Sequence, residues 1–156
     1  MRSANELNMP SFQTMFMQTK GKPIQWNGQT LVMVDAFPVS KQEKLRLVFE
    51  NFGSEWKQGV ILDTKGSFVV NGKDCGRKVL LWQDTAPREV NLEVTSKEGA
   101  VRIKNCWDTG DGTIHSWHHG AAMIVDDLGG KRRYRCNDGH PDDNFTDIVF
   151  TVEVAK

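Results

Sequence analysis

The hydrophobic residues of this chain come in short runs, and glycine, asparagine, aspartate or proline separates one run from the next. Short runs rich in β-branched and aromatic residues are typical of strands joined by turns, whereas an amphipathic helix needs a longer 3.6-residue repeat. The clearest alternation is that of Val90, Leu92 and Val94, followed by Val101 and Ile103. With residues 96–99 as the connection, this pattern predicts a hairpin.

Further strands are predicted on both sides of that hairpin, and one helical turn is predicted at residues 40–44, where Ser40 precedes Glu43 by three positions. Lys65-Gly66 and Asn71-Gly72 are predicted turns, because glycine accepts the positive φ that tight turns demand. Many short strands with few helices favour a two-sheet sandwich or a barrel. We expect an all-β fold, an antiparallel two-sheet β-sandwich of jelly-roll type, with residues 1–10 as a flexible N-terminal segment and residues 11–156 as a single domain. The other predicted strands are 14–18, 24–26, 31–34, 45–49, 60–62, 67–70, 78–82, 121–125, 132–136 and 148–154.

The charge balance argues against two classes of partner. Twenty basic residues are matched by twenty acidic ones, so no long-range field favours nucleic acid or an anionic membrane. Residues 1–10 lack the apolar stretch of a secretory signal, which predicts a cytoplasmic location. Three widely spaced cysteines do not form a disulfide framework, although a bridge between Cys106 and Cys136 is an alternative.

Most of the chemically versatile side chains lie in residues 105–119 and 135–143. These two turn-rich segments hold all four histidines, two of the three cysteines and two of the five tryptophans. We therefore expect the functional site to form where the two segments meet.

One hypothesis for this region is a metal site. Asp108, Asp111, Asp138, Asp142 and Asp143 lie in glycine-containing loops, and oxygen-rich flexible loops suit calcium. A structural calcium is one alternative, although the spacing is not that of an EF-hand and acidic residues beside glycine are also ordinary turn formers. The other alternative is zinc or a different transition metal, held by His115, His118 or His140 with Asp or Cys partners. No Cys-x-x-Cys pair is present, however.

Catalytic patterns are weaker. Cys106 or Cys136 could pair with a histidine as an activated nucleophile, but such a site is defined by geometry in space that sequence spacing does not supply. A carboxylate pair for glycoside cleavage could be chosen from almost any acidic loop. We therefore expect no catalytic residue.

A binding surface fits the same residues better. Indole faces beside short polar groups are suited to carbohydrate, because a sugar ring stacks on an aromatic face while polar side chains bond its hydroxyls. In this interpretation Trp107 or Trp117 stacks, Arg135 donates, and Asp108, Asn137 and Asp138 bind hydroxyls. The predicted ligand-binding residues are Asn105, Trp107, Asp108, Asp111, His115, Trp117, Arg135, Asn137 and Asp138.

The C-terminal half resembles the galactose-binding-like jelly-roll modules in its pattern of strands and paired loops. The similarity covers residues 78–82, 101–105, 132–139 and 145–154. The phrases Asn105-x-Trp107 and Tyr134-x-Cys136-Asn137-Asp138-Gly139 also resemble bacterial proteins of uncharacterised function. The jelly-roll resemblance implies non-catalytic binding of a carbohydrate or similar small polar ligand, often with a structural calcium.

Two alternatives accompany this prediction of a non-catalytic binding module. The first is a metal-binding protein or metal-dependent enzyme that uses the His, Asp and Cys residues between Asn105 and Asp143. The second is a structural protein that forms a homo-oligomer or binds a partner through exposed strand edges and surface tryptophans.

Overall fold

The computed structural model describes residues 11–116, 120–139 and 145–155, and within them the chain is all-β with a single short helix. The elements are α2 (Phe12–Gln18), β1 (Ile24–Trp26), β2 (Gln29–Leu31), β3 (Asp35–Pro38), β4 (Gln42–Phe52), β5 (Lys57–Val70), β6 (Lys73–Trp82), β7 (Glu89–Ser96), β8 (Ala100–Asp108), β9 (Ala122–Asp127), β10 (Lys131–Asn137) and β11 (Ile148–Val154).

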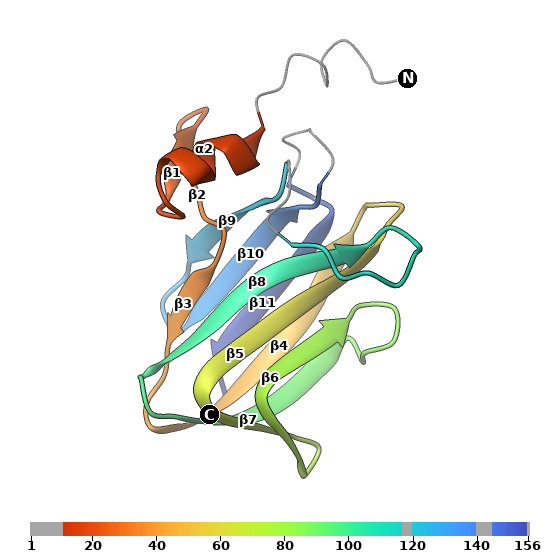
Figure 1. Ribbon diagram of the computed structural model, residues 1–156. Coiled ribbons are helices and arrows are strands. Elements are labelled where there is room, and N and C mark those ends of the chain that lie inside the picture. The colour runs from red at the N-terminus through yellow and green to blue at the C-terminus, as the bar shows by residue number, and fades with distance from the viewer. Residues whose placement is uncertain (1–10, 117–119, 140–144, 156) are drawn as a thin grey trace.

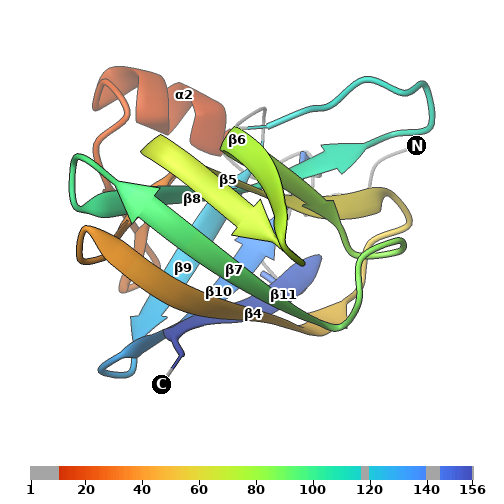
Figure 2. The same cartoon turned by 90° about the horizontal axis from the view of Figure 1, so that it is seen from below.

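Nine strands form one antiparallel sheet that curls until its two edges nearly meet. The order is β3-β8-β5-β7-β4-β11-β10-β9, with β6 added on the other side of β5. Figure 1 shows these strands running around a common interior, and Figure 2 shows β5, β6 and β8 lying across from β9, β10 and β11. A bridge between Val32 and Met123, just before β3 and within β9, connects the two edges. The antiparallel all-β prediction is confirmed: nine of the eleven strands form one hydrogen-bonded sheet, and β1 and β2 pair in a separate two-stranded sheet.

The core lies inside this curled sheet because apolar and polar residues alternate along its strands. In β7, Val90, Leu92 and Val94 are buried, while Glu89 and Glu93 face solvent. Similar inward positions on β4, β5, β8, β10 and β11 complete the core. Alternation places every second side chain on the same face, and this fixes the register of the strands.

Strand β5 bends near its middle, and this bend, which we call the corner, divides the curled sheet into two walls, one containing β8 and the other containing β7. Its first half pairs with β8, and its second half pairs with β7. At the corner, Gly66 lies so close to β7 that a Cβ added there would be 1.8 Å from the carbonyl oxygen of Thr95. Lys65-Gly66 is therefore a bend inside one continuous strand, and the predicted turn at this place is wrong.

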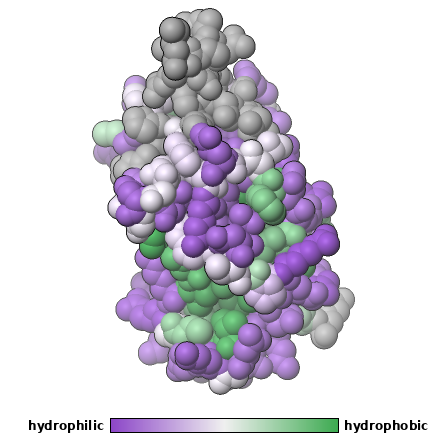
Figure 3. Space-filling model, turned by 90° about the vertical axis from the view of Figure 1, so that its right-hand side faces the viewer, coloured by the Kyte–Doolittle hydropathy of each residue, from purple (hydrophilic) through white to green (hydrophobic). Residues whose placement is uncertain are grey.

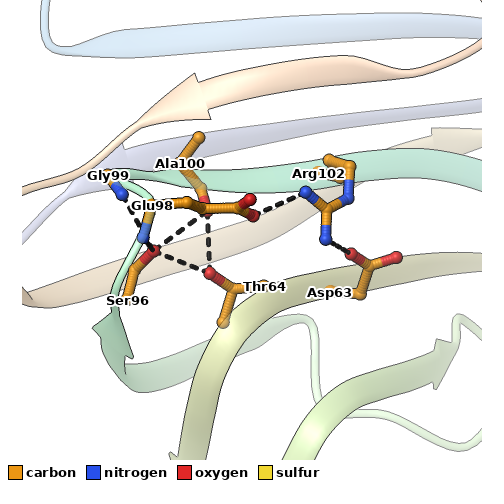
Figure 4. A network of polar contacts seen from close by, with 7 residues as sticks. All are labelled: Asp63, Thr64, Ser96, Glu98, Gly99, Ala100 and Arg102. Atoms are coloured by element: carbon orange, nitrogen blue, oxygen red, sulfur yellow. Dashed lines mark hydrogen bonds and ion pairs between the residues drawn. The ribbon is translucent and has the colours of Figure 1, made fainter.

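The buried hydroxyl groups of Thr64 and Ser96 stabilise the corner where it meets the β7–β8 connection, as Figure 4 shows. Thr64 Oγ1 lies 2.8 Å from both Ser96 Oγ and the carbonyl oxygen of Ala100. Ser96 Oγ also accepts hydrogen bonds from the backbone N–H groups of Glu98 and Gly99. These bonds satisfy buried polar groups at the point where the chain passes from one wall to the other.

The predicted hairpin at residues 90–103 has the right strands and the wrong pairing. β7 and β8 form as expected, but both pair with β5 and not with each other. Ser96 lies opposite Gly66 and Arg102 opposite Asp63, so the connection is an outward bulge that leaves the two strands in line along β5. Alternation identifies strands, but it carries no information about which strand lies next to which.

The N-terminal region differs most from prediction. Residues 14–18, predicted as a strand, belong to the helix α2, which buries Phe12 and Phe16. These rings pack with Ile24 and Leu31 against Ala122 and other residues on the outer face of the sheet, as a second apolar cluster. Figure 1 shows α2 and β1 beside β9 at this side of the molecule.

The predicted helical turn at residues 40–44 is also absent, because β4 begins at Gln42. Ser40 and Glu43 do interact, with Ser40 Oγ donating to Glu43 Oε1 at 2.9 Å. The same side-chain pair that caps a helix here stabilises the start of a strand. The described residues contain no helix long and apolar enough to cross a membrane.

Candidate polar ligand site

The two segments predicted to form a site do meet at one end of the curled sheet. Asn105, near the end of β8, donates from Nδ2 to the carbonyl oxygen of Asn137, at the end of β10, over 2.8 Å. Both residues are buried. The contact joins opposite walls of the sheet at this end.

A cluster of polar side chains, four of them buried and one partly buried, surrounds this contact. We call it the polar end, and it consists of Ser54, Gln58, Asn105, Asn137 and Asp138. The Asp138 carboxylate, which is fully buried, accepts hydrogen bonds from Ser54 Oγ at 2.5 Å and from Gln58 Nε2 at 3.0 Å. Asp138 therefore holds the start of β5 against the end of β10.

Backbone geometry around residues 145–147 brings the polar end together. Phe145 adopts a φ of 54°, and its N–H donates to Asn137 Oδ1 at 2.7 Å. Asp147 Oδ2 accepts from the N–H of Asp138 at 2.9 Å. Gly53 lies against this segment, since a Cβ there would be 2.9 Å from the carbonyl oxygen of Thr146. The segment of residues 145–147 can pass this close to residue 53 because Gly53 has no side chain.

One acceptor of the polar end has no partner among the described residues. Gln58 is fully buried, and its Nε2 donates to the carbonyl oxygen of Trp56 and to Asp138 Oδ2, but its Oε1 receives no hydrogen bond there. Rotating the amide by 180° would place Oε1 against two acceptors, so the hydrogen bonds fix its orientation. A buried polar atom without a partner costs about 1–3 kcal/mol. A hydrogen-bond donor delivered to this atom would remove that cost.

Three aromatic rings form a ladder beside the polar end. Trp107 lies in the middle, since it pairs with Gln58 of β5 on one side and with His115 on the other. Its ring is nearly parallel to those of Trp56 and His115, with centroids 6.5 and 6.2 Å away. Gly139 lies close to the indole, because a Cβ there would be 3.0 Å from Cζ2. Trp107 is thus 2% exposed and contributes to packing, while Trp56 and His115 are partly exposed.

The predicted acidic loop forms ordinary turns. Asp108 Oδ1 accepts hydrogen bonds from the N–H groups of Gly110 and Gly112, and Asp111 Oδ1 accepts one from Thr113 N–H. The bond from Thr113 lowers the pKa of Asp111. Such side-chain to backbone bonds explain why aspartate stands beside glycine here.

No group of three or more His, Cys, Asp or Glu side chains is arranged to hold a metal ion within the part of the chain that the structure describes. His118, His140, Asp142 and Asp143, which the metal hypothesis also used, lie outside the described residues. So does Trp117, the second predicted stacking residue.

Arg135 is placed away from Asp138. Its guanidinium pairs with Asp126 of the neighbouring strand β9, with Nε 3.0 Å from Oδ2. Asp108 is the last residue of β8, and Asp111 lies on the loop that follows it. Of the predicted residues that the structure describes, Asn105, Trp107, His115, Asn137 and Asp138 come together.

Sequence reasoning missed Ser54, Trp56 and Gln58. They lie far from residues 105–143 in the sequence, and no motif marks them. The pairing of β5 with β8 brings them to Trp107, and no spacing rule reveals that pairing.

No family model matches the chain, and no curated protein or solved structure shows significant similarity to it. The geometry of the polar end therefore carries the functional proposal.

The two cysteines near the site are free thiols with very low reactivity expected. Cys106 and Cys136 are buried and unbridged, whereas Cys75 is exposed. Burial raises the pKa of Cys106 to about 12 against a weak opposing effect of Lys104 and Lys78, and it raises the pKa of Cys136 as well. The thiolate is the reactive form, so a raised pKa suppresses reaction at neutral pH.

We therefore expect one of the three thiols to react rapidly with Ellman's reagent in the folded protein at about pH 8, and all three after denaturation in guanidinium. Substituting Cys75→Ser should remove the rapid phase. Rapid reaction of a second thiol in the folded protein would contradict the burial of Cys106 and Cys136.

Proposed function

We propose that this chain is a non-catalytic binding protein whose polar end takes a small, hydroxyl-bearing ligand such as a carbohydrate. The observation that carries the proposal is the fully buried Gln58 Oε1, an acceptor without a partner among the described residues. Binding proteins place a few directed polar groups in otherwise apolar surroundings, and the ring ladder supplies such surroundings here.

The hydrogen-bond inventory favours a ligand that donates. Ser54 Oγ and both N–H groups of Gln58 are already used within the protein. What Gln58 still offers is a lone pair, and Asp138 next to it is a carboxylate. A hydroxyl can donate to such an acceptor, whereas phosphate or carboxylate anions bring only further acceptors. Neutral polyols and sugars therefore suit the site better than anions.

Trp56 is the ring that best suits stacking with a sugar. It is partly exposed, lies two residues before Gln58, and is supported from below by Trp107. This assigns to Trp56 the role first predicted for Trp107. The galactose-binding-like resemblance and the jelly-roll assignment stay predictions.

The test is a nuclear magnetic resonance titration of the ¹⁵N-labelled protein with D-galactose, D-glucose, D-mannose and glycerol as probes. We expect at least one saccharide to shift the side-chain amide signals of Gln58 and the indole N–H signal of Trp56. Gln58→Met, which keeps the side-chain length and removes the acceptor, should abolish the Trp56 shift. Gln42→Met, at an exposed position on β4, is the matched control and should leave the shift unchanged.

Unchanged Gln58 and Trp56 signals with every probe would contradict the proposal. So would equal shifts in the wild type and in Gln58→Met, since the acceptor would then play no part in binding.

A further inference from the structure

Strand β6 has one edge without a strand partner. β6 pairs with β5 along its length, and within the described residues no strand pairs with its other edge. A free edge presents a row of backbone N–H and C=O groups, which is a template for an additional strand.

An apolar groove lies beside that edge. It runs between Leu80–Trp82 of β6, the connection at residues 85–87 and Glu89–Asn91 of β7. Val70 and Asn71 also line it, and its volume is about 220 Å³. Figure 3 shows apolar residues in a hollow between hydrophilic margins on this side of the molecule. Sites for drug-sized ligands usually have about 300–1,000 Å³. The groove is thus suited to one or two apolar side chains and not to a whole small molecule.

The first half of β6 is positively charged. Lys73, Arg77 and Lys78 are exposed, and none of them forms an ion pair with another described residue. The one acidic side chain between them, Asp74, accepts a hydrogen bond from Gly76 N–H. Opposite charges across neighbouring strands stabilise the pair, and like charges destabilise it.

The same charges decide between two occupants of the edge. A second copy of this chain pairing through β6 would bring these cations close to one another, and lysines on an edge strand are a known protection against such self-association. An acidic strand from a different protein would face complementary charge.

We propose that β6 accepts an extended, acidic segment of another protein as an additional antiparallel or parallel strand. The backbone of the acidic segment pairs with the free edge of β6, and the carboxylates of the segment lie against Lys73, Arg77 and Lys78. An apolar side chain of the segment enters the groove. This surface is separate from the polar end, and the proposal does not depend on the proposed function.

The probe for this proposal is a fluorescein-labelled peptide in which glutamate alternates with valine or leucine, with binding followed by fluorescence anisotropy. Two peptide controls separate the contributions. A peptide with lysine in place of glutamate tests the charge, and the acidic peptide with alternate backbone nitrogens methylated tests strand pairing. We expect each control to bind at least about tenfold more weakly than the acidic peptide.

The matched protein variants carry the same change in net charge at two places. Arg77→Glu with Lys78→Glu should weaken binding of the acidic peptide by about tenfold or more. Lys20→Glu with Lys22→Glu, exposed positions beyond α2, should leave it unchanged. Circular dichroism of both variants verifies that they are folded.

Three results would overturn the proposal. These are no binding of the acidic peptide up to about 1 mM, equal binding of the acidic and methylated peptides, and equal loss of affinity in both double variants. Concentration-dependent self-association of the wild type, lost in Arg77→Glu with Lys78→Glu, would instead assign the edge to a second copy of this chain.

Discussion

Gly66→Ala is expected to lower the free energy of unfolding by about 4 kcal/mol or more, which is a large part of the total stability of a domain of this size. A Cβ at this position would lie 1.8 Å from the carbonyl oxygen of Thr95 and 2.8 Å from its carbonyl carbon. Both atoms belong to the backbone of β7, so no rotamer change can relieve the overlap. Any displacement would also pull Ser96 away from Thr64, to which it is hydrogen-bonded.

Urea denaturation followed by tryptophan fluorescence, together with the soluble yield, measures this effect. Gly130→Ala is the matched control, because nothing lies within 4 Å of a Cβ there, and its stability should be within about 0.5 kcal/mol of wild type. If Gly66→Ala lost less than about 1 kcal/mol, the tight approach of β5 to β7 at the corner would be refuted.

The second large effect is expected for Asp138→Ala. Removing the carboxylate leaves the Ser54 hydroxyl and the Gln58 amide, both inside the polar end, without their shared acceptor. Each buried donor left unpaired costs about 1–3 kcal/mol, so we expect a loss of about 3 kcal/mol in the free energy of unfolding. Asp138→Asn keeps an acceptor oxygen at nearly the same place and should recover part of this loss.

Urea midpoints of the wild type and of both variants measure the difference. Asp84→Ala is the control, since this carboxylate is half exposed and its one ion pair among the described residues is with Lys57 at 3.7 Å. A surface ion pair of this kind contributes little, so its midpoint should be almost unchanged. Equal losses in Asp138→Ala and Asp138→Asn would show that the carboxylate is not held as the hydrogen bonds describe.

The sequence predicts strands well where burial alternates along a single segment. Residues 148–154 were predicted as a strand and form β11, and the Asn71-Gly72 turn joins β5 to β6 with a positive φ at both positions. Prediction was wrong where a neighbour in space decides the structure. The corner at Gly66 depends on the backbone of β7, and α2 is stabilised by packing on β9.

In the candidate site, too, the features that depend on a single segment could be predicted, and those that depend on neighbours in space could not. The meeting of residues 105–119 and 135–143 was predicted because both segments carry ligand-type side chains, and the contact of Asn105 with Asn137 forms. Ser54, Trp56 and Gln58 could not be predicted, because they reach the site through the pairing of β5 with β8, and that pairing spans about fifty residues of chain. Burial of Trp107 was likewise decided by neighbours distant in the sequence.

The position of β11 between β4 and β10 has a consequence for biosynthesis. On the ribosome, β4 emerges well before β10, and β11, the strand that joins them, emerges after both. Until residue 154 has left the exit tunnel, β9 and β10 cannot be joined to β4 through β11, and the apolar faces of these strands stay open to water. The sheet can therefore be completed only after β11 has been made, and sheets built from such distant partners fold slowly.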